Sequence, residues 1–171
     1  MKHVNFEFKA RLRNEALVRQ VLKKLRARFV GIDHQMDTYF RVPHGRLKVR
    51  EGNIENALIF YERPNTAGAR AARIQMVELP PKNAVKSILR AALGVLTVVR
   101  KRREIYFVGN VKIHLDRVRG LGEFVEVEAI SRTDKLDVVR GQAREFQRLF
   151  QIASEDLVGE SYSDLILERS A

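Results

Sequence analysis

Hydrophobic and polar residues alternate along most of this chain, and the pattern begins near its first residue. In VNFEFKARL, residues 4–12, the even positions are apolar and the odd positions are polar or charged. Successive side chains of a strand point to opposite faces, so this segment is predicted to be a half-buried β-strand. Similar strand-like sequence, separated by turn-forming residues, predicts further strands at residues 29–42, 46–51, 57–64, 73–78, 96–108, 111–118 and 123–131.

Three other segments carry apolar residues at helical spacing. The predicted helices cover residues 15–28 with Asn14 as N-cap, the stretch from Pro80 to Gly94, and the stretch from Thr133 and Asp134 to Phe150. The segment SYSDLIL, residues 161–167, predicts a short helical tail. The small, basic segment 65–72 is interpreted as a mobile loop and a candidate gate.

The helices indicate which face of the sheet is covered. Each amphipathic helix needs an apolar surface to pack on, and in one domain of this size the apolar face of the sheet is the available one. Covering that face buries residues such as Phe8, Val49 and Val127, and it turns the charged faces toward a common space. The sequence therefore predicts one α+β domain over residues 1–171, with enough antiparallel strands to close into a barrel or tunnel.

Composition narrows the class of protein. Hydrophobic residues make up 45% and charged residues 31% of the chain, which is typical of soluble globular proteins. The apolar run from Ala91 to Val99 is too short to span a bilayer, and no signal-peptide pattern is present, so a cytoplasmic location is expected. The absence of cysteine excludes disulfides and a cysteine-ligated zinc, and the four histidines are scattered without ligand spacing. The net charge of +11 predicts attraction to polyanions.

The polar faces of the predicted strands carry both signs of charge. They hold Glu7, Lys9, Arg11, Arg46, Lys48, Arg50, Glu62 or Arg63, Lys101, Arg103, Lys112, His114, Asp116, Glu126 and Glu128. One such face alone is usually a solvated surface. Many basic side chains around one space favour a polyanionic ligand, whereas carboxylates among them favour a divalent ion. Glu126 and Glu128 point to the same side of their strand and could share a metal with Glu7.

Five segments together resemble the CYTH domain of the triphosphate tunnel metalloenzymes, most closely its class IV adenylate cyclase branch. They are NFEFKARL, DTYFRVPHGRLKVRE, LIFYERP, VVRKRREIYFVGNVKIHLDRVRGLGEFVEVE and SYSDLIL. The resemblance implies an eight-stranded antiparallel β tunnel, which is a closed barrel with a charged lumen and flanking helices. It also implies a linear triphosphate ligand, Mg²⁺ or Mn²⁺ as cofactor, and, since related proteins are often dimers, a homodimer.

The resemblance assigns roles to individual residues. In the Glu-x-Glu-x-Lys signature of the first strand, Glu7 and Lys9 match, while Asn5 replaces the first Glu. A Lys of the LIFYERP strand is missing; Glu62 is nearest and Arg63 is a possible substitute. The implied residues are Lys9, Lys101 and Arg103 for catalysis, Lys48, Arg50, Arg63, Lys101 and Arg103 for substrate, and Glu7, Asp116, Glu126 and Glu128 for metal.

Several functions remain open at this stage. The resemblance favours a metal-dependent, adenylate cyclase-like enzyme that converts ATP to cyclic AMP and pyrophosphate. The alternatives are an inorganic tripolyphosphatase, a thiamine triphosphatase, or a non-catalytic protein that binds triphosphate or polyphosphate. A basic nucleic-acid binder with Tyr39, Phe40, Tyr61 and Phe107 as stacking residues is disfavoured, because such a groove has little use for carboxylates.

Overall fold

The computed structural model describes residues 2–131 and 136–170. In chain order the elements are β1 (Lys2–Arg11), α1 (Glu15–Lys24), β2 (Arg28–Phe40), β3 (Arg46–Glu51), β4 (Ala57–Glu62), β5 (Arg70–Glu78), α2 (Val85–Leu93), β6 (Val95–Val108), β7 (Val111–Val118), β8 (Gly122–Ser131), α3 (Leu136–Leu149), the 3₁₀ turn Ser154–Asp156 and α4 (Tyr162–Ser170). The predicted helix start at Thr133 and Asp134 lies outside the described residues.

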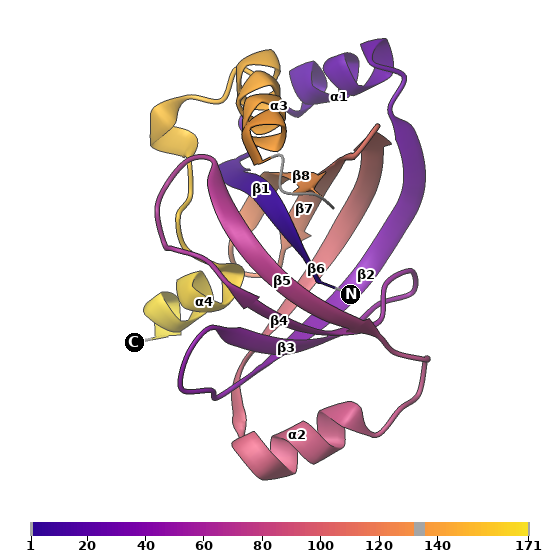
Figure 1. Cartoon of the computed structure of the whole chain (residues 1–171), viewed down its shortest axis with the longest axis vertical. Helices are drawn as coiled ribbons and strands as arrows, with labels where there is room; N and C mark the ends of the chain where they lie inside the picture. The colour runs from indigo at the N-terminus through magenta and orange to yellow at the C-terminus, as the bar shows by residue number, and fades with distance from the viewer. Residues whose placement is uncertain (1, 132–135, 171) are drawn as a thin grey trace.

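The eight strands form one closed antiparallel ring, as predicted. Their order around the ring is β1-β5-β4-β3-β2-β6-β7-β8, and β1 closes it by pairing with both β5 and β8 (Figure 1). Closure leaves no free strand edge. It also separates the two faces of every strand, so that alternate side chains point into the ring or away from it.

Two helices cover one outer side of the ring. On α1 and α3, Val18 and Phe146 pack in the same cluster as Phe8 of β1 and Val127 of β8 (Figure 1). The side chain of Asn14 caps α1 by accepting the backbone N–H of Leu17. The prediction that apolar strand faces point outward against helices is therefore confirmed for this side of the tunnel.

The prediction for α2 was wrong in one respect, because none of its residues is buried and Ile88 is 61% exposed. α2 belongs to the long connection from β5 to β6 and lies beyond one end of the ring, beside β2 (Figure 1). The amphipathic spacing was correct, but the chain places the helix away from the apolar face of the sheet. Among the described residues, no helix is long and apolar enough to cross a membrane.

Three predicted boundaries also need correction. α2 begins at Val85 rather than at Pro80. α1 ends at Lys24 rather than near residue 28, because Arg26 takes a positive φ of 52° and the chain reverses into β2. β5 begins at Arg70, inside the predicted loop 65–72, because Arg70 pairs with Glu7 in the β1–β5 ladder.

Candidate functional site

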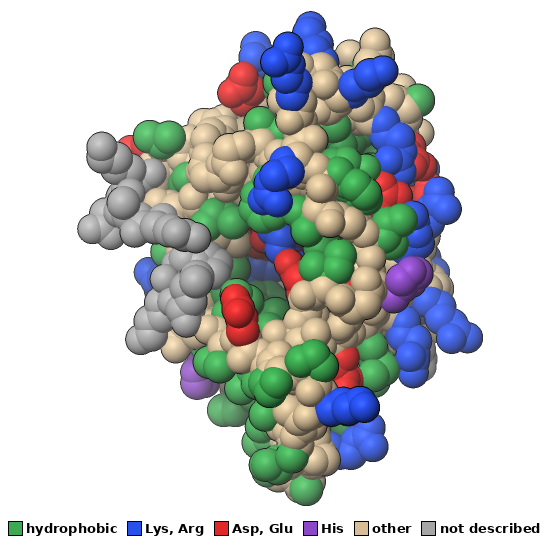
Figure 2. All heavy atoms as spheres, turned by 90° about the vertical axis from the view of Figure 1, so that its right-hand side faces the viewer, with side chains coloured by type: hydrophobic (Ala, Val, Ile, Leu, Met, Phe, Trp, Pro, Cys, Tyr) green, Lys and Arg blue, Asp and Glu red, His purple; other side chains and the backbone are tan. Residues whose placement is uncertain are grey.

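Three hollows follow one another through the ring. A narrow central cavity of about 90 Å³ shares Tyr39 and Arg63 with a hollow of about 900 Å³, and it shares Arg50, Ile74 and Glu128 with one of about 560 Å³. Figure 2 shows a face hollowed near its middle, with acidic and basic side chains set back among apolar ones. The tunnel thus has a charged waist between two wider ends.

Cations outnumber carboxylates two to one around the waist. Its basic side chains are Lys9, Lys48, Arg50, Arg63, Lys101 and Arg103, and its acidic side chains are Glu7, Glu126 and Glu128. Eight of the nine were predicted to face the lumen, Arg63 was one of two residues considered for its position, and the structure brings all nine together. Their excess positive charge in a confined space suits an anion that carries several charges.

Asp37 of β2 lies at the centre of the basic side of the tunnel. Its carboxylate accepts hydrogen bonds from Lys101 at 2.7 Å, from Lys48 at 2.9 Å and from Arg50 at 2.9 and 3.1 Å. Burial would raise the pKa of Asp37, but the attraction of these three cations outweighs burial and holds the pKa well below its ordinary value. The sequence analysis did not single out Asp37, although it alternates correctly with Tyr39 along the predicted strand.

The single negative charge of Asp37 does not balance the three cations around it, and the pKa of Lys101 is lowered. Burial lowers the pKa of Lys101 to about 7, although Asp37 opposes the shift. A phosphate beside Lys101 would favour its charged form and raise that pKa again.

A second cluster fixes Arg103. Its guanidinium donates to both oxygens of Asp116, at 2.7 and 2.5 Å, and also to Glu126 at 2.6 Å. Asp116 additionally accepts the hydroxyl of Tyr162 at 2.8 Å. Both oxygens of Asp116 are therefore engaged, which suits a residue that orients Arg103.

Lys9 lies where β1 meets the segment that leads into α4. Its ammonium donates to the backbone carbonyl of Glu160 at 3.0 Å, lies 3.4 Å from Glu126, and sits 4.0 Å from the centre of the Tyr162 ring. Burial lowers the pKa of Lys9 to about 8, against the attraction of Glu126. Lys9 can thus exchange a proton close to neutral pH.

The sequence left open whether Glu62 or Arg63 faces the tunnel, and in the structure Arg63 does. Its side chain lies 3.2 Å from Glu7 and donates to the backbone of Gly159, whereas Glu62 is exposed. Arg70, which the sequence analysis placed in a loop, is 4% exposed and donates to the backbone of Thr66. Arg63 and Arg70 therefore bind the predicted gate segment and the 158–160 segment to the tunnel wall.

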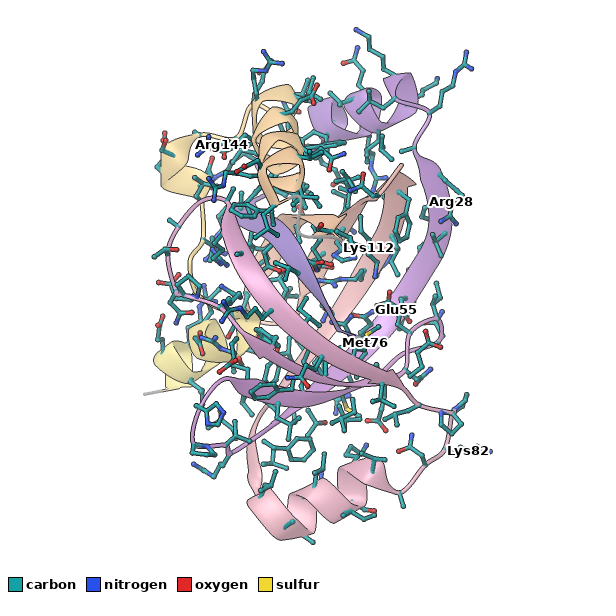
Figure 3. The ribbon with its side chains drawn as sticks, viewed as in Figure 1. Arg28, Glu55, Met76, Lys82, Lys112 and Arg144 are labelled. Atoms are coloured by element: carbon teal, nitrogen blue, oxygen red, sulfur yellow. The ribbon has the colours of Figure 1, made fainter. Side chains whose placement is uncertain are left out.

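Glu55 is a functional candidate that no periodic pattern revealed. It lies in the β3–β4 connection and accepts hydrogen bonds from Arg50 and Lys112. Glu55 and Lys112 are labelled in Figure 3. Asp33 fixes this connection by accepting the backbone N–H groups of Ile54 and Glu55 at 2.9 and 3.0 Å.

The carboxylates Glu126 and Glu128 gather around a histidine. Nδ1 of His114 lies 3.7 Å from an oxygen of each, and of the described residues these three form the group whose ligand atoms lie within 4.8 Å of one another. Burial raises the pKa of Glu128 to about 7 and lowers that of His114 to about 3. The histidines have no ligand spacing in the sequence, and it is strand register that brings His114 opposite Glu126.

These donors fit a divalent cation. Within the described part of the chain, both ring nitrogens of His114 and the amide oxygen of Asn5 are buried without a hydrogen-bond partner. Nδ2 of Asn5 lies 3.4 Å from Glu128, so Asn5 adjoins the carboxylate pair. Buried polar groups normally have partners, and a metal ion would provide one.

Three of the four aromatic residues considered for nucleic-acid stacking are enclosed by the fold, whereas Phe107 is half-buried and lines the 560 Å³ hollow. Tyr39, Phe40 and Tyr61 are 3%, 2% and 9% exposed. Tyr39 and Tyr61 line the tunnel waist, where a nucleic-acid strand on the surface cannot stack on them.

Known proteins resemble this chain over nearly its whole length. The chain is 31% identical to adenylate cyclase CyaB of Aeromonas hydrophila, with 93% of this chain and 86% of the relative aligned. It is 28% identical to a protein of Methanocaldococcus jannaschii named as a candidate adenylate cyclase, with 95% and 98% aligned. A solved structure, the PH1012 protein of Pyrococcus horikoshii, superposes with a TM-score of 0.79 at 27% identity over 94% of this chain and 98% of that one.

The match to a family model is as extensive as these pairwise alignments. The CYTH domain matches residues 3–162, which include all eight strands of the ring apart from the first residue of β1. The chain belongs to the CYTH domain family.

Proposed function

We propose that this protein is a metal-dependent enzyme that acts on a triphosphate in the tunnel, and that it most closely follows the adenylate cyclase reaction. The observation that carries the proposal is the waist, where six cationic side chains converge with three carboxylates. The cations suit a linear polyphosphate and the carboxylates suit its metal ion, so neither set is surplus. The adenylate cyclase names of two relatives support the choice of reaction.

In this proposal the substrate cations come from three strands of the ring, of which β3 and β4 are neighbours. Lys48 and Arg50 come from β3, Lys101 and Arg103 from β6, and Arg63 from the end of β4. With Lys9 they neutralise the phosphates and stabilise the charge that develops as the bond to phosphorus changes. Lys9, Lys101 and Arg103 are the proposed catalytic residues, and Asp116 is proposed to hold Arg103 in position.

Glu126 and Glu128 are the proposed metal ligands, with Glu7 opposite Glu128 in the β1–β8 ladder. A bound Mg²⁺ or Mn²⁺ would polarise the phosphate oxygens and lower the pKa of the attacking hydroxyl. Arg103 and Lys9 contact Glu126 and hold its pKa well below the ordinary value against the effect of burial, which keeps this ligand ionised.

The 560 Å³ hollow favours a substrate with an organic group over inorganic tripolyphosphate. It adjoins the waist through Arg50 and Glu128, and its lining combines apolar side chains and amides with five charged side chains. The apolar and amide residues include Ile54, Ile74, Leu79, Phe107, Ile130, Asn53 and Asn56. Apolar walls with a few polar groups are typical of sites for heterocyclic ligands.

For ATP, the proposed reaction joins the 3′-hydroxyl oxygen to the α-phosphorus. The bond from the α-phosphorus to the oxygen that bridges it to the β-phosphorus breaks, pyrophosphate leaves with the electron pair, and the hydroxyl proton passes to water. In a triphosphatase the same site would instead direct water to the terminal phosphorus, releasing orthophosphate.

Product analysis tests the proposal. Purified protein is offered ATP, tripolyphosphate and thiamine triphosphate with Mg²⁺ or Mn²⁺, alongside the variants Glu126→Gln and Glu123→Gln. Glu123 is the matched control, because it lies on the same strand but is exposed. Cyclic AMP and pyrophosphate, lost in Glu126→Gln and kept in Glu123→Gln, would support the cyclase. Orthophosphate without cyclic AMP would indicate the hydrolase, and binding without any product would indicate a triphosphate sensor.

A further inference from the structure

We propose that His114 supplies a nitrogen ligand to the metal site, so that the site selects a first-row transition ion such as Mn²⁺ over Mg²⁺. The site consists of Nδ1 of His114, one oxygen each of Glu126 and Glu128, and the neighbouring amide of Asn5. This inference rests on the proposed function in one respect, because the same two carboxylates are proposed to hold the catalytic ion.

The geometry of the three donors suits a common ion. His114 lies directly opposite Glu126 in the β7–β8 ladder, and its Nδ1 is 3.7 Å from both Glu126 Oε2 and Glu128 Oε1. Two ligands bound at about 2.1 Å in an octahedral shell lie roughly 3.0 Å apart when adjacent and roughly 4.2 Å apart when opposite. The observed 3.7 Å separations lie between these two values and are too long for hydrogen bonds, so a shared ion would draw adjacent donors together by roughly 0.7 Å.

The imidazole of His114 makes no hydrogen bond among the described residues. His114 is 1% exposed, and neither of its nitrogens has a hydrogen-bond partner in that part of the chain. A histidine kept only for packing would leave two buried polar atoms unsatisfied, at a cost in stability. Coordination of an ion between His114 and the two carboxylates satisfies Nδ1 and balances the negative charge.

The donor set determines the class of ion. Mg²⁺ prefers oxygen ligands and retains water, whereas an imidazole nitrogen favours first-row transition ions, with affinity rising from Mn²⁺ through Co²⁺ to Ni²⁺. Asn5 places a neutral amide next to Glu128, with its nitrogen 3.4 Å from the carboxylate, so the set His114, Glu126, Glu128 and Asn5 carries fewer negative charges than four carboxylates would. The smaller negative charge weakens the binding of a hard ion such as Mg²⁺ more than that of Mn²⁺, because Mn²⁺ also gains a bond to nitrogen.

The first test uses Mn²⁺ alone, without any triphosphate. Tag-free protein is loaded with Mn²⁺ and examined by electron spin echo envelope modulation, both unlabelled and with ¹⁵N-histidine. We expect ¹⁴N modulation that changes to the ¹⁵N pattern in the labelled protein. No nitrogen coupling, or no bound Mn²⁺, would overturn the proposal, and this measurement requires no variant to fold.

The second test measures selectivity by competition between Mn²⁺ and Mg²⁺. The variant His114→Phe keeps a buried ring without nitrogen, and His34→Phe is the matched control on an exposed histidine. We expect the preference for Mn²⁺ to fall by about tenfold or more in His114→Phe only, with little change in Mg²⁺ affinity. An unchanged preference would overturn the proposal.

The two proposals fail separately. Turnover of a triphosphate without nitrogen coordination would leave the proposed function standing and reject His114 as a ligand. Nitrogen coordination without any product would support the metal site and reject the enzyme.

Discussion

The hydroxyl of Tyr162 donates to Oδ2 of Asp116 over 2.8 Å, and both side chains are buried. This bond connects the first residue of α4 to β7 in the tunnel wall. Because Asp116 also holds the guanidinium of Arg103, the C-terminal helix takes part in orienting a proposed phosphate ligand.

Removing that hydroxyl tests the connection. Tyr162→Phe should lower the free energy of unfolding by about 1.5 to 3 kcal/mol, because a charged acceptor loses a buried donor. Urea unfolding measures the change. In a double-mutant cycle with Asp116→Asn, the combined loss should be smaller than the sum of the single losses. Strictly additive losses would show that the two side chains act independently.

Asp37 should be the most sensitive carboxylate of the basic cluster. Asp37→Asn leaves Lys48, Arg50 and Lys101 without their shared counter-charge, so unfolding free energy should fall by about 3 to 5 kcal/mol. Thermal unfolding should show added tripolyphosphate restoring part of the loss. The control Asp137→Asn changes a side chain that is 98% exposed, and it should leave stability within about 0.5 kcal/mol. Equal effects in the two variants would contradict the cluster.

Triphosphate affinity should weaken as the pH rises through neutrality. Lys101 and Lys9 have pKa values of about 7 and 8, and only their protonated forms attract phosphate. Bound phosphate raises these values, so affinity should fall by about tenfold or more between roughly pH 7 and pH 9. Calorimetry measures the fall. Lys101→Arg stays charged and should flatten the profile; an equally steep profile would exclude Lys101 from the binding step.

The same lysine affects stability with the opposite dependence on pH. The pKa of Lys101 is about 7 in the folded protein against an ordinary 10.5, so the unfolded chain binds more protons between these values. Unfolding free energy from this group should therefore rise with pH across that window in the ligand-free protein. Comparing urea midpoints of the protein and Lys101→Met from pH 7 to about pH 10 isolates the effect.

Gly52 should tolerate no side chain, although its backbone conformation is ordinary. An added Cβ would lie 2.5 Å from Oδ1 of Asp33, whose carboxylate holds the backbone of Ile54 and Glu55. Gly52→Ala should therefore cost about 1 to 3 kcal/mol and disturb Glu55. Gly141→Ala is the control, because it meets no atom within 4 Å and replaces glycine within a helix. It should stabilise the protein by up to about 1 kcal/mol. Denaturation midpoints distinguish the two.

Period-two alternation was sufficient to place Lys101, Arg103 and Glu126 inside the tunnel, because strand faces are visible in the local sequence. The grouping of His114 with Glu126 was not, since it depends on the register between two strands. Glu55 is positioned by Asp33, 22 residues earlier, and such a contact leaves no periodic trace. The helical spacing of α2 was visible, but its place beyond the ring follows from how the β5–β6 connection travels.

The pairing of β1 also bears on how the protein is made. β1 is synthesised first, yet its partners lie in β5 and in β8, which ends at Ser131. The lumen therefore cannot be enclosed until Ser131 has left the ribosome, several seconds or more after Lys9 at about 5 to 20 residues per second. Until then, Lys9 and the other inward cations stay hydrated. Their mutual repulsion is compensated by the carboxylates of the lumen only when β1 pairs with β8, which is a late, long-range step.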